Sequence, residues 1–230
     1  MHPLTELLKR HQAEIASIFP FNLNEVPTVI SDCSSNNKDL TTIDLTNVEA
    51  YSTLAQAFLA ENGAIAGVGG YLEERIIYQG RGMFETEEEP RNIHLGIDVS
   101  VKAGTALHAP LPSTVHSFAN NAQFGDYGPT IILAHTIENS QFFTLYGHLS
   151  VDSLKDLVVG QKIEKGAAFA TLGDTHENGN WPPHLHFQLI TDMLSYQGDF
   201  PGVCAKSKLP CYQNICPNPN WILKIDKLPF

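Results

Sequence analysis

From about residue 67 onward, the chain consists of short runs rich in β-branched and aromatic residues, separated by Gly, Pro, Asn and Asp. Typical runs are TVHSFA, TIILAHT, FFTLYGHL and HLHFQLI. Runs of this length between turn-forming residues predict the strands of an antiparallel sheet or a small sandwich. We therefore expect a mainly β protein whose functional residues lie on the sheet.

Two helical patterns precede these runs. Residues 5–19 carry apolar side chains at helical spacing, which predicts one amphipathic helix. The sequence TNVE at 46–49 has the pattern of a capping box, and Asn62-Gly63 is a stop signal, so a second helix is expected over 47–62. Amphipathic helices normally bury their apolar face, so we expect a small helical layer packed permanently on the far face of the sheet. The alternative is that this layer lies over the groove as a removable mask.

These zones predict three parts of the chain. An N-terminal helical segment takes residues 1–65, a β domain takes 66–198, and an irregular tail or lid takes 199–230, where Pro, Cys and Asn are frequent and periodicity is weak. Three of the four cysteines lie in the tail without CxxC spacing, so free thiols are expected there. They are Cys204, Cys211 and Cys216.

Charge and hydropathy exclude two classes of partner. The net charge is −11 with only 14 Lys and Arg, whereas nucleic-acid binding draws its affinity from clustered basic residues. No apolar run approaches the roughly 20 residues of a membrane span. The first residues lack the basic-then-apolar pattern of a secretory signal. We expect a cytoplasmic protein without nucleic-acid or membrane partners.

The stretch RNIHLGIDVS sets His94 and Asp98 four residues apart in an otherwise apolar run. An ionised carboxylate is strongly disfavoured in the interior unless a cation or several donors face it. In an extended strand, positions four apart are separated by about 13 Å, too far for both to reach one ion. Gly96 between them permits a bend. A bent strand would bring both side chains to one cation.

A second pair of polar residues lies in PPHLHFQL, where His184 and His186 point to the same face of a strand. Joined to the pair above, His186 completes a 2-His-1-carboxylate set that leaves coordination positions open, as catalytic zinc requires. We expect one zinc ion per chain, although the same set also serves non-haem Fe(II). No HExxH motif supplies a glutamate base, so His184 or His148 is expected to act as the catalytic base.

Three segments, HLGID, TLYGHLS and PPHLHFQ, resemble in this order the signature segments of the lysostaphin-type zinc metalloendopeptidases. The resemblance covers about residues 70–192 and extends to the turns VKAGTALHAP and VVGQKIEKG. It implies a β fold, a peptide or peptidoglycan-fragment substrate, and hydrolysis of peptide bonds in peptidoglycan-type or glycine-rich peptides. The implied zinc ligands are His94, Asp98 and His186, and the implied catalytic residues beside them are His148 and His184.

Two departures from the family pattern stand out. Gln188 takes the place of the usual Glu after HLHF, and the loop DTHENGNWPP with Trp181 is bulkier than the usual approach to the histidine pair. We expect a groove that is narrower or that is shaped for another substrate. Tyr127 and Tyr146 are candidates for a further donor, although aromatic residues in strands normally pack. His135 is expected to be structural or to support a ligand.

A non-catalytic binding or regulatory module is the remaining alternative. The turns VKAGTALHAPLPSTV and VVGQKIEKG also resemble hairpins of biotinyl and lipoyl carrier domains, but no Lys flanked by Met marks an attachment point. All five polar residues of the expected site are present, which favours an enzyme.

Overall fold

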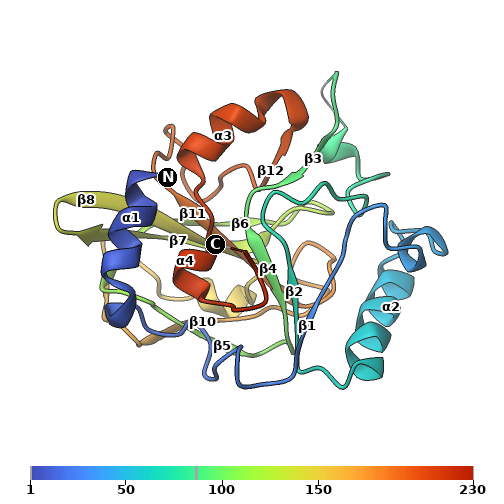
Figure 1. Ribbon diagram of the computed structural model, residues 1–230, viewed down its shortest axis with the longest axis horizontal. Coiled ribbons are helices and arrows are strands. Elements are labelled where there is room, and N and C mark those ends of the chain that lie inside the picture. The colour runs from blue at the N-terminus through green and yellow to red at the C-terminus, as the bar shows by residue number, and fades with distance from the viewer. Residues whose placement is uncertain (1, 86–87, 230) are drawn as a thin grey trace.

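The computed structural model describes residues 2–85 and 88–229, and its centre is one large sheet (Figure 1). The main sheet has the strand order β1-β2-β4-β11-β8-β7-β6-β9, and all its neighbours are antiparallel except β1 and β2. The expected mainly β fold is confirmed, with one parallel pair at the edge. The strands of the main sheet are β1 (Thr28–Ile30), β2 (Ala66–Gly69), β4 (Ile97–Ser100), β6 (Ser113–Asn121), β7 (Gly128–Ile137), β8 (Ser140–Gly147), β9 (Lys162–Ile163) and β11 (His184–Ile190).

Two small sheets of two strands and several short helices complete the described chain. In the small sheets, β3 (Arg91–His94) pairs with β12 (Val203–Ala205), and β5 (Ala106–His108) pairs with β10 (Ala168–Thr171). The α-helices are α1 (Pro3–Arg10), α2 (Val48–Glu61), α3 (Leu209–Ile215) and α4 (Asn220–Leu223). Single 3₁₀ turns are η1 (Gln12–Glu14), η2 (Asp39–Thr41), η3 (Gly82–Phe84), η4 (Val151–Leu154) and η5 (Lys206–Lys208).

Side chains alternate across β11 as the sequence predicts. Leu185, Phe187 and Leu189 enter the main apolar core, where the leucines of α1 also pack. His184 and His186 point to the opposite face. The main sheet therefore has one face covered by α1 and by residues 222–228, and one face that carries the histidines.

The first helix is shorter than the predicted helix over residues 5–19. It ends at Arg10, and after the turn η1 the chain runs extended. There its backbone bonds to the β5 region: the Ala16 N–H donates to the Pro110 carbonyl at 2.9 Å, and the His108 N–H donates to the Ile18 carbonyl at 2.8 Å. The apolar residues beyond Arg10 are still buried. The apolar spacing of these residues correctly indicated that they are buried, but it did not indicate a continued helix.

The second helix forms where it was predicted, but it does not join α1. Asn47 is its N-cap, because its side-chain oxygen accepts the Ala50 N–H at 3.0 Å, whereas the Thr46 hydroxyl donates to Asp44. Tyr51 is its only buried residue, and α2 lies at the edge of the molecule beside β1 (Figure 1). The single helical layer on the far face that we expected is therefore wrong for α2.

The C-terminal segment is more regular than the expected irregular tail. β12 pairs with β3, and α3 and α4 follow it. The reason is tertiary, since Ile222 and Ile225 enter the main core although no long periodic pattern marks them. The four cysteines are free, as expected.

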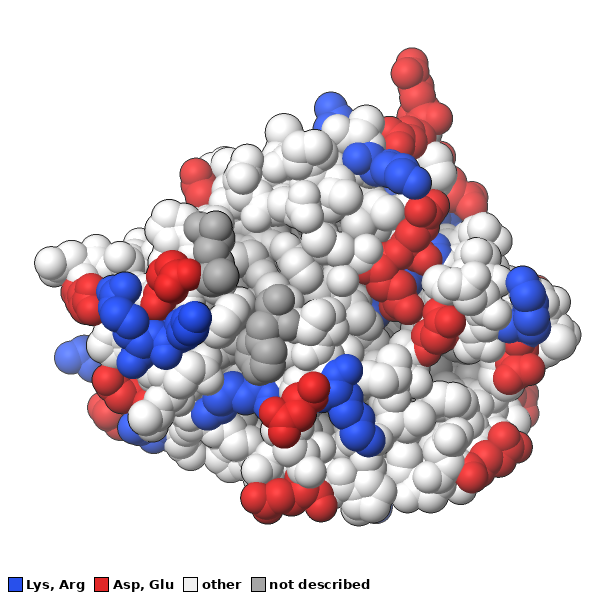
Figure 2. Space-filling view, viewed as in Figure 1, with Lys and Arg blue, Asp and Glu red and all other residues white. Residues whose placement is uncertain are grey.

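Charge is unevenly distributed over the surface. On the face shown in Figure 2, acidic side chains gather along one flank, over α2 and the segment that joins β2 to β3. None of the described helices has the length and hydropathy needed to cross a bilayer.

Deletion of residues 1–65 should leave an insoluble or unfolded fragment. The deletion removes Leu4, Leu7 and Leu8, all buried in the main core. Each buried leucine contributes about 1.5–3 kcal/mol, and the sum rivals the roughly 5–15 kcal/mol stability of a whole domain. Expression and thermal unfolding of the fragment measure the effect. A soluble, cooperatively folded fragment with higher hydrolytic activity than the full chain would show that this segment is a removable mask.

Candidate active site

The bend expected in HLGID is present. His94 ends β3, which pairs with β12, and Asp98 lies in β4, which belongs to the main sheet. Leu95 and Gly96 connect the two strands. In the register of β4 and β11, Asp98 stands directly opposite His186. A change of sheet at Gly96 thus brings all three predicted metal ligands to one point.

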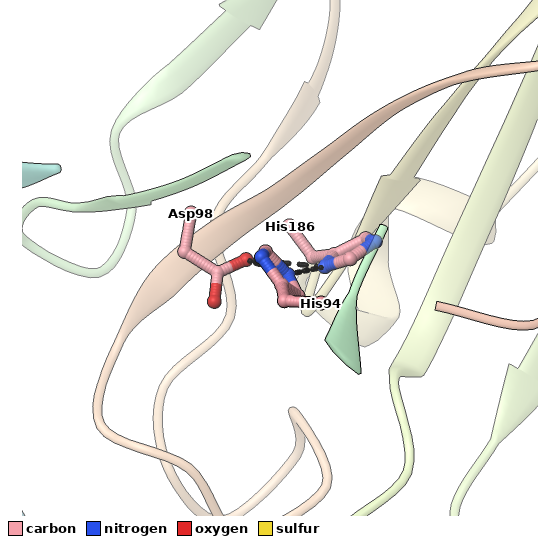
Figure 3. A group of neighbouring side chains, drawn as sticks. All are labelled: His94, Asp98 and His186. Atoms are coloured by element: carbon pink, nitrogen blue, oxygen red, sulfur yellow. Dashed lines mark hydrogen bonds and ion pairs between the residues drawn. The ribbon is translucent and has the colours of Figure 1, made fainter. Parts of the chain in front are cut away.

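The three ligand atoms form a small triangle (Figure 3). Nε2 of His94 lies 2.9 Å from Nδ1 of His186, Oδ1 of Asp98 lies 3.1 Å from Nδ1 of His186, and it lies 3.2 Å from Nε2 of His94. Two ligands of a tetrahedral ion with bonds of about 2.0–2.1 Å are about 3.3 Å apart. Among the described residues, these three side chains form the one cluster whose spacing suits a metal ion.

Each imidazole is held in the tautomer that a metal ligand needs. His94 donates its Nδ1–H to the carbonyl of Gly70 at 3.1 Å, which leaves Nε2 free. His186 donates its Nε2–H to Oε1 of Gln188 at 2.9 Å, which leaves Nδ1 free. Partners of this kind fix the ring orientation of metal-binding histidines.

The unusual Gln188 is matched to its surroundings. Its amide group donates to the carbonyl of Pro201 at 3.2 Å and to the sulfur of Cys216 at 3.3 Å, and the side chain is fully buried. A glutamate would present an oxygen to the Pro201 carbonyl instead of a donor. The amide is therefore the group that satisfies both His186 and the C-terminal segment.

The charged state of the site follows from burial and from Arg75. Burial works against the ionised form of Asp98, but the positive charges that face it, at His94 when that ring is protonated and at Arg75, hold its pKa well below the ordinary value. Burial, together with the charge of Arg75, lowers the pKa of His94 to about 3. At neutral pH the site holds a carboxylate and a neutral imidazole, which are the forms that bind metal ions.

His148 and His184 lie side by side next to the triangle. Their ring centroids are 4.1 Å apart, and Nε2 of His184 lies 3.9 Å from Oδ2 of Asp98. Each donates its Nδ1–H to a backbone carbonyl at 2.7 Å, His148 to Asn178 and His184 to Pro182. His148 has a φ of 62°, a left-handed conformation that is uncommon outside glycine and is often found at functional sites.

Burial is the main cause that lowers the pKa of both rings, and it is reinforced at His148 by its neighbour His184. At His184 the charge of Asp98 opposes the shift. Both imidazoles are therefore neutral at neutral pH. Each can take up a proton at Nε2, as a general base requires.

His148 and His184 line a cavity of about 220 Å³, together with Asp98, His186 and Tyr127. The Tyr127 hydroxyl lies 3.4 Å from Nε2 of His186 and donates to the carbonyl of Phe200 at 3.2 Å. Tyr146 is not at the site, because it packs in the main core on the other face. His135 is buried away from the cavity, where its Nε2 is bonded to the Thr144 hydroxyl at 2.7 Å.

Trp181 forms one wall of the cavity. Its indole N–H donates to the Gly125 carbonyl at 3.0 Å, and the guanidinium of Arg81 lies 3.6 Å from the ring centroid. The indole centroid lies 6.4 Å from those of both His148 and His184. The loop expected to narrow the groove thus closes one side of it beside the two histidines.

Sequence reasoning missed several residues at this site. Arg75 contacts Asp98, Gly70 holds His94, and Asp126 lines the cavity with a pKa that burial raises to about 6. Arg75 lies in the charged stretch YLEERIIY, which is typical of a solvated surface. No local pattern marked it.

Comparison with known proteins agrees with this geometry. Residues 92–197 match the model of peptidase family M23. This segment contains all five residues of the expected site, which are His94, Asp98, His148, His184 and His186. Residues 92–197 form an M23 peptidase domain. A protein of Haemophilus influenzae named an uncharacterized metalloprotease is 36% identical to this chain over 95 residues, which are 41% of this chain and only 18% of that protein.

Solved structures similar to this chain include two peptidases. A zinc-containing peptidase from Vibrio cholerae is 24% identical, with 43% of this chain and 27% of that chain covered and a TM-score of 0.34. The catalytic domain of lysostaphin from Staphylococcus simulans is 20% identical, with 53% and 80% covered and a TM-score of 0.34.

Gly96→Ala should reduce metal binding. A Cβ at this position would lie 2.7 Å from Cε1 of His186 and 2.7 Å from the Phe187 carbonyl, so the ring must move. Overpacking of this kind costs about 1–3 kcal/mol. Metal content per chain and thermal unfolding measure the two effects. Gly82→Ala is the control, because a Cβ there meets no atom within 4 Å. Full metal content in Gly96→Ala would refute this reading of the bend.

Gln188→Glu should destabilise the fold. The change replaces two donated hydrogen bonds by an oxygen facing the Pro201 carbonyl, and an unsatisfied or repelled buried group costs about 1–3 kcal/mol. Denaturant unfolding at neutral pH compares this variant with Gln141→Glu, which makes the same change at an exposed position of β8. Equal stability of the two variants would contradict the role given to the amide.

Proposed function

We propose that this protein is a zinc-dependent metalloendopeptidase that hydrolyses peptide bonds. The observation that carries the proposal is the convergence of five polar side chains, all of which except His94 line one cavity. Three of them place ligand atoms 2.9–3.2 Å apart, and two neutral imidazoles lie beside them. Membership of the domain in peptidase family M23 supports the same chemistry.

The donor set suits zinc. Two imidazoles and one carboxylate are the protein ligands of several catalytic zinc sites, with coordination left open for the reaction. A bound zinc ion polarises the scissile carbonyl and lowers the pKa of water from 15.7 toward about 7. Within the chain, Nδ1 of His186 and Nε2 of His94 are the free ring nitrogens, and Oδ1 of Asp98 is the free carboxylate oxygen.

The two further histidines supply proton transfer. His148 and His184 each bond a backbone carbonyl through Nδ1. These bonds fix the orientation of each ring and leave its Nε2 available for proton transfer. One can accept the proton of the attacking water and return it to the leaving amine. Asp98, 3.9 Å from Nε2 of His184, stabilises the protonated form of that ring. An iron oxygenase would have no use for this pair, which favours hydrolysis.

Peptidoglycan-type stem peptides and glycine-rich peptides are the proposed substrates. The resemblance to lysostaphin-type enzymes suggests them, and the cavity of about 220 Å³ with Trp181 as one wall suits a slender chain.

The decisive experiment combines metal analysis with digestion. Protein purified without added metal should contain about one zinc per chain and should cleave peptidoglycan-type peptides, oligoglycine or both. Asp98→Ala should lose the zinc. His148→Ala and His184→Ala should keep it and lose turnover by about 10²–10⁴-fold, the range of a general acid or base.

Three outcomes would contradict the proposal. Iron in place of zinc would support the non-haem Fe(II) alternative. Stoichiometric zinc in Asp98→Ala would refute the ligand set. A zinc-loaded protein that binds these peptides without cleaving them would support a binding or regulatory module.

A further inference from the structure

Arg75 is a buried cation outside the matched M23 segment. It lies between β2 and β3, and its side chain is fully enclosed. Its Nε donates to Oε2 of Glu73 at 2.7 Å, and its Nη1 donates to Oδ2 of Asp98. A buried guanidinium is costly unless carboxylates face it. Arg75 is therefore held in place by two carboxylates, one of which is a metal ligand.

The two oxygens of Asp98 have different partners. Oδ1 faces His94 at 3.2 Å and His186 at 3.1 Å, whereas Oδ2 faces Arg75. A carboxylate that has one oxygen bonded to a guanidinium on one side presents its other oxygen to a metal ion on the opposite side. The contact thus fixes the rotation of the carboxylate and keeps Oδ1 on the metal side.

The backbone leaves room for this contact. Gly69 stands opposite Asp98 in the register of β2 and β4, and a Cβ at Gly69 would lie 2.6 Å from Nη2 of Arg75. The guanidinium fills the space that a side chain at Gly69 would take. The main sheet therefore carries a slot for Arg75 beside the metal ligand.

The same segment holds a second ligand. The carbonyl of Gly70 accepts the Nδ1–H of His94, and the backbone N–H of His94 donates to the carbonyl of Glu73 at 3.0 Å. Glu73 is in turn fixed, because its Oε1 accepts the N–H of Cys33 at 3.0 Å. Residues 70–75 thus connect the metal ligands to the chain that follows β1.

We propose that Arg75 is a positioning residue of the metal centre, which it serves by holding Asp98 so that a single oxygen faces the ion. The inference rests on the metal site of the proposed function. On this proposal, residues 70–75, which precede the M23 domain, contribute directly to the metal site.

The test uses substitutions that conserve charge, because removal of Arg75 alone would leave Glu73 unpaired. Arg75→Lys keeps the charge but cannot bond both carboxylates in the same geometry. The double variant Glu73→Gln with Arg75→Met removes one charge of each sign. Gly69→Ala displaces the guanidinium without touching it chemically. Arg10→Lys is the control, because Arg10 pairs with Glu138 on the exposed surface.

Zinc affinity is measured by competition with a chromogenic chelator, and the ligand field is measured from the visible spectrum of the Co(II)-substituted protein. Loss of a partner of a metal ligand typically weakens metal binding by about 10–100-fold. We expect such a loss and a shifted Co(II) spectrum in the Arg75 variants and in Gly69→Ala, with Arg10→Lys unchanged.

A purely structural role would lower the thermal stability of the metal-free protein and leave zinc affinity and the Co(II) spectrum unchanged, which would overturn the proposal. If the double variant does not fold, Arg75→Lys and Gly69→Ala decide by the same readouts. A wild-type protein that binds zinc without cleaving peptides would refute the proposed activity and leave this test intact.

Discussion

The buried charge of Asp98 is the constraint on which the site depends. Its side chain is 14% exposed, so the carboxylate must be answered by positive charge or donors from the protein itself. Arg75 donates a hydrogen bond to one oxygen, and the other oxygen faces two imidazoles with room for a metal ion between them. Three segments that are far apart in sequence therefore meet at one carboxylate.

The register of the main sheet turns this requirement into geometry. Gly69, Asp98 and His186 stand in one row across β2, β4 and β11. Gly69 has no side chain and leaves space for the Arg75 guanidinium. Gly96 likewise leaves space for the His186 ring. A slip of one residue would move Asp98 to the apolar face, so the sheet and the site have to form together.

The sequence predicted what is local and periodic. Alternation in HLHFQLI placed His184 and His186 on one face, and Gly96 marked the bend that brings His94 to Asp98. Features set by tertiary contact escaped it. The apolar spacing of residues 5–19 was satisfied by extended chain on β5, and Arg75 looked like a surface charge because its partners, at positions 73 and 98, carry no signal of their shared burial.

The proposed metal centre is completed by segments on both sides of the M23 domain. Before the M23 domain, Gly70 and Arg75 hold His94 and Asp98. After it, Pro201 and Cys216 hold Gln188, which orients His186. All three proposed ligands thus depend on contacts with residues outside 92–197. A segment that only masked the groove could be removed without a change in the positions of the ligand atoms. The contacts of the flanking segments fix those positions, so the flanking segments belong to the site itself.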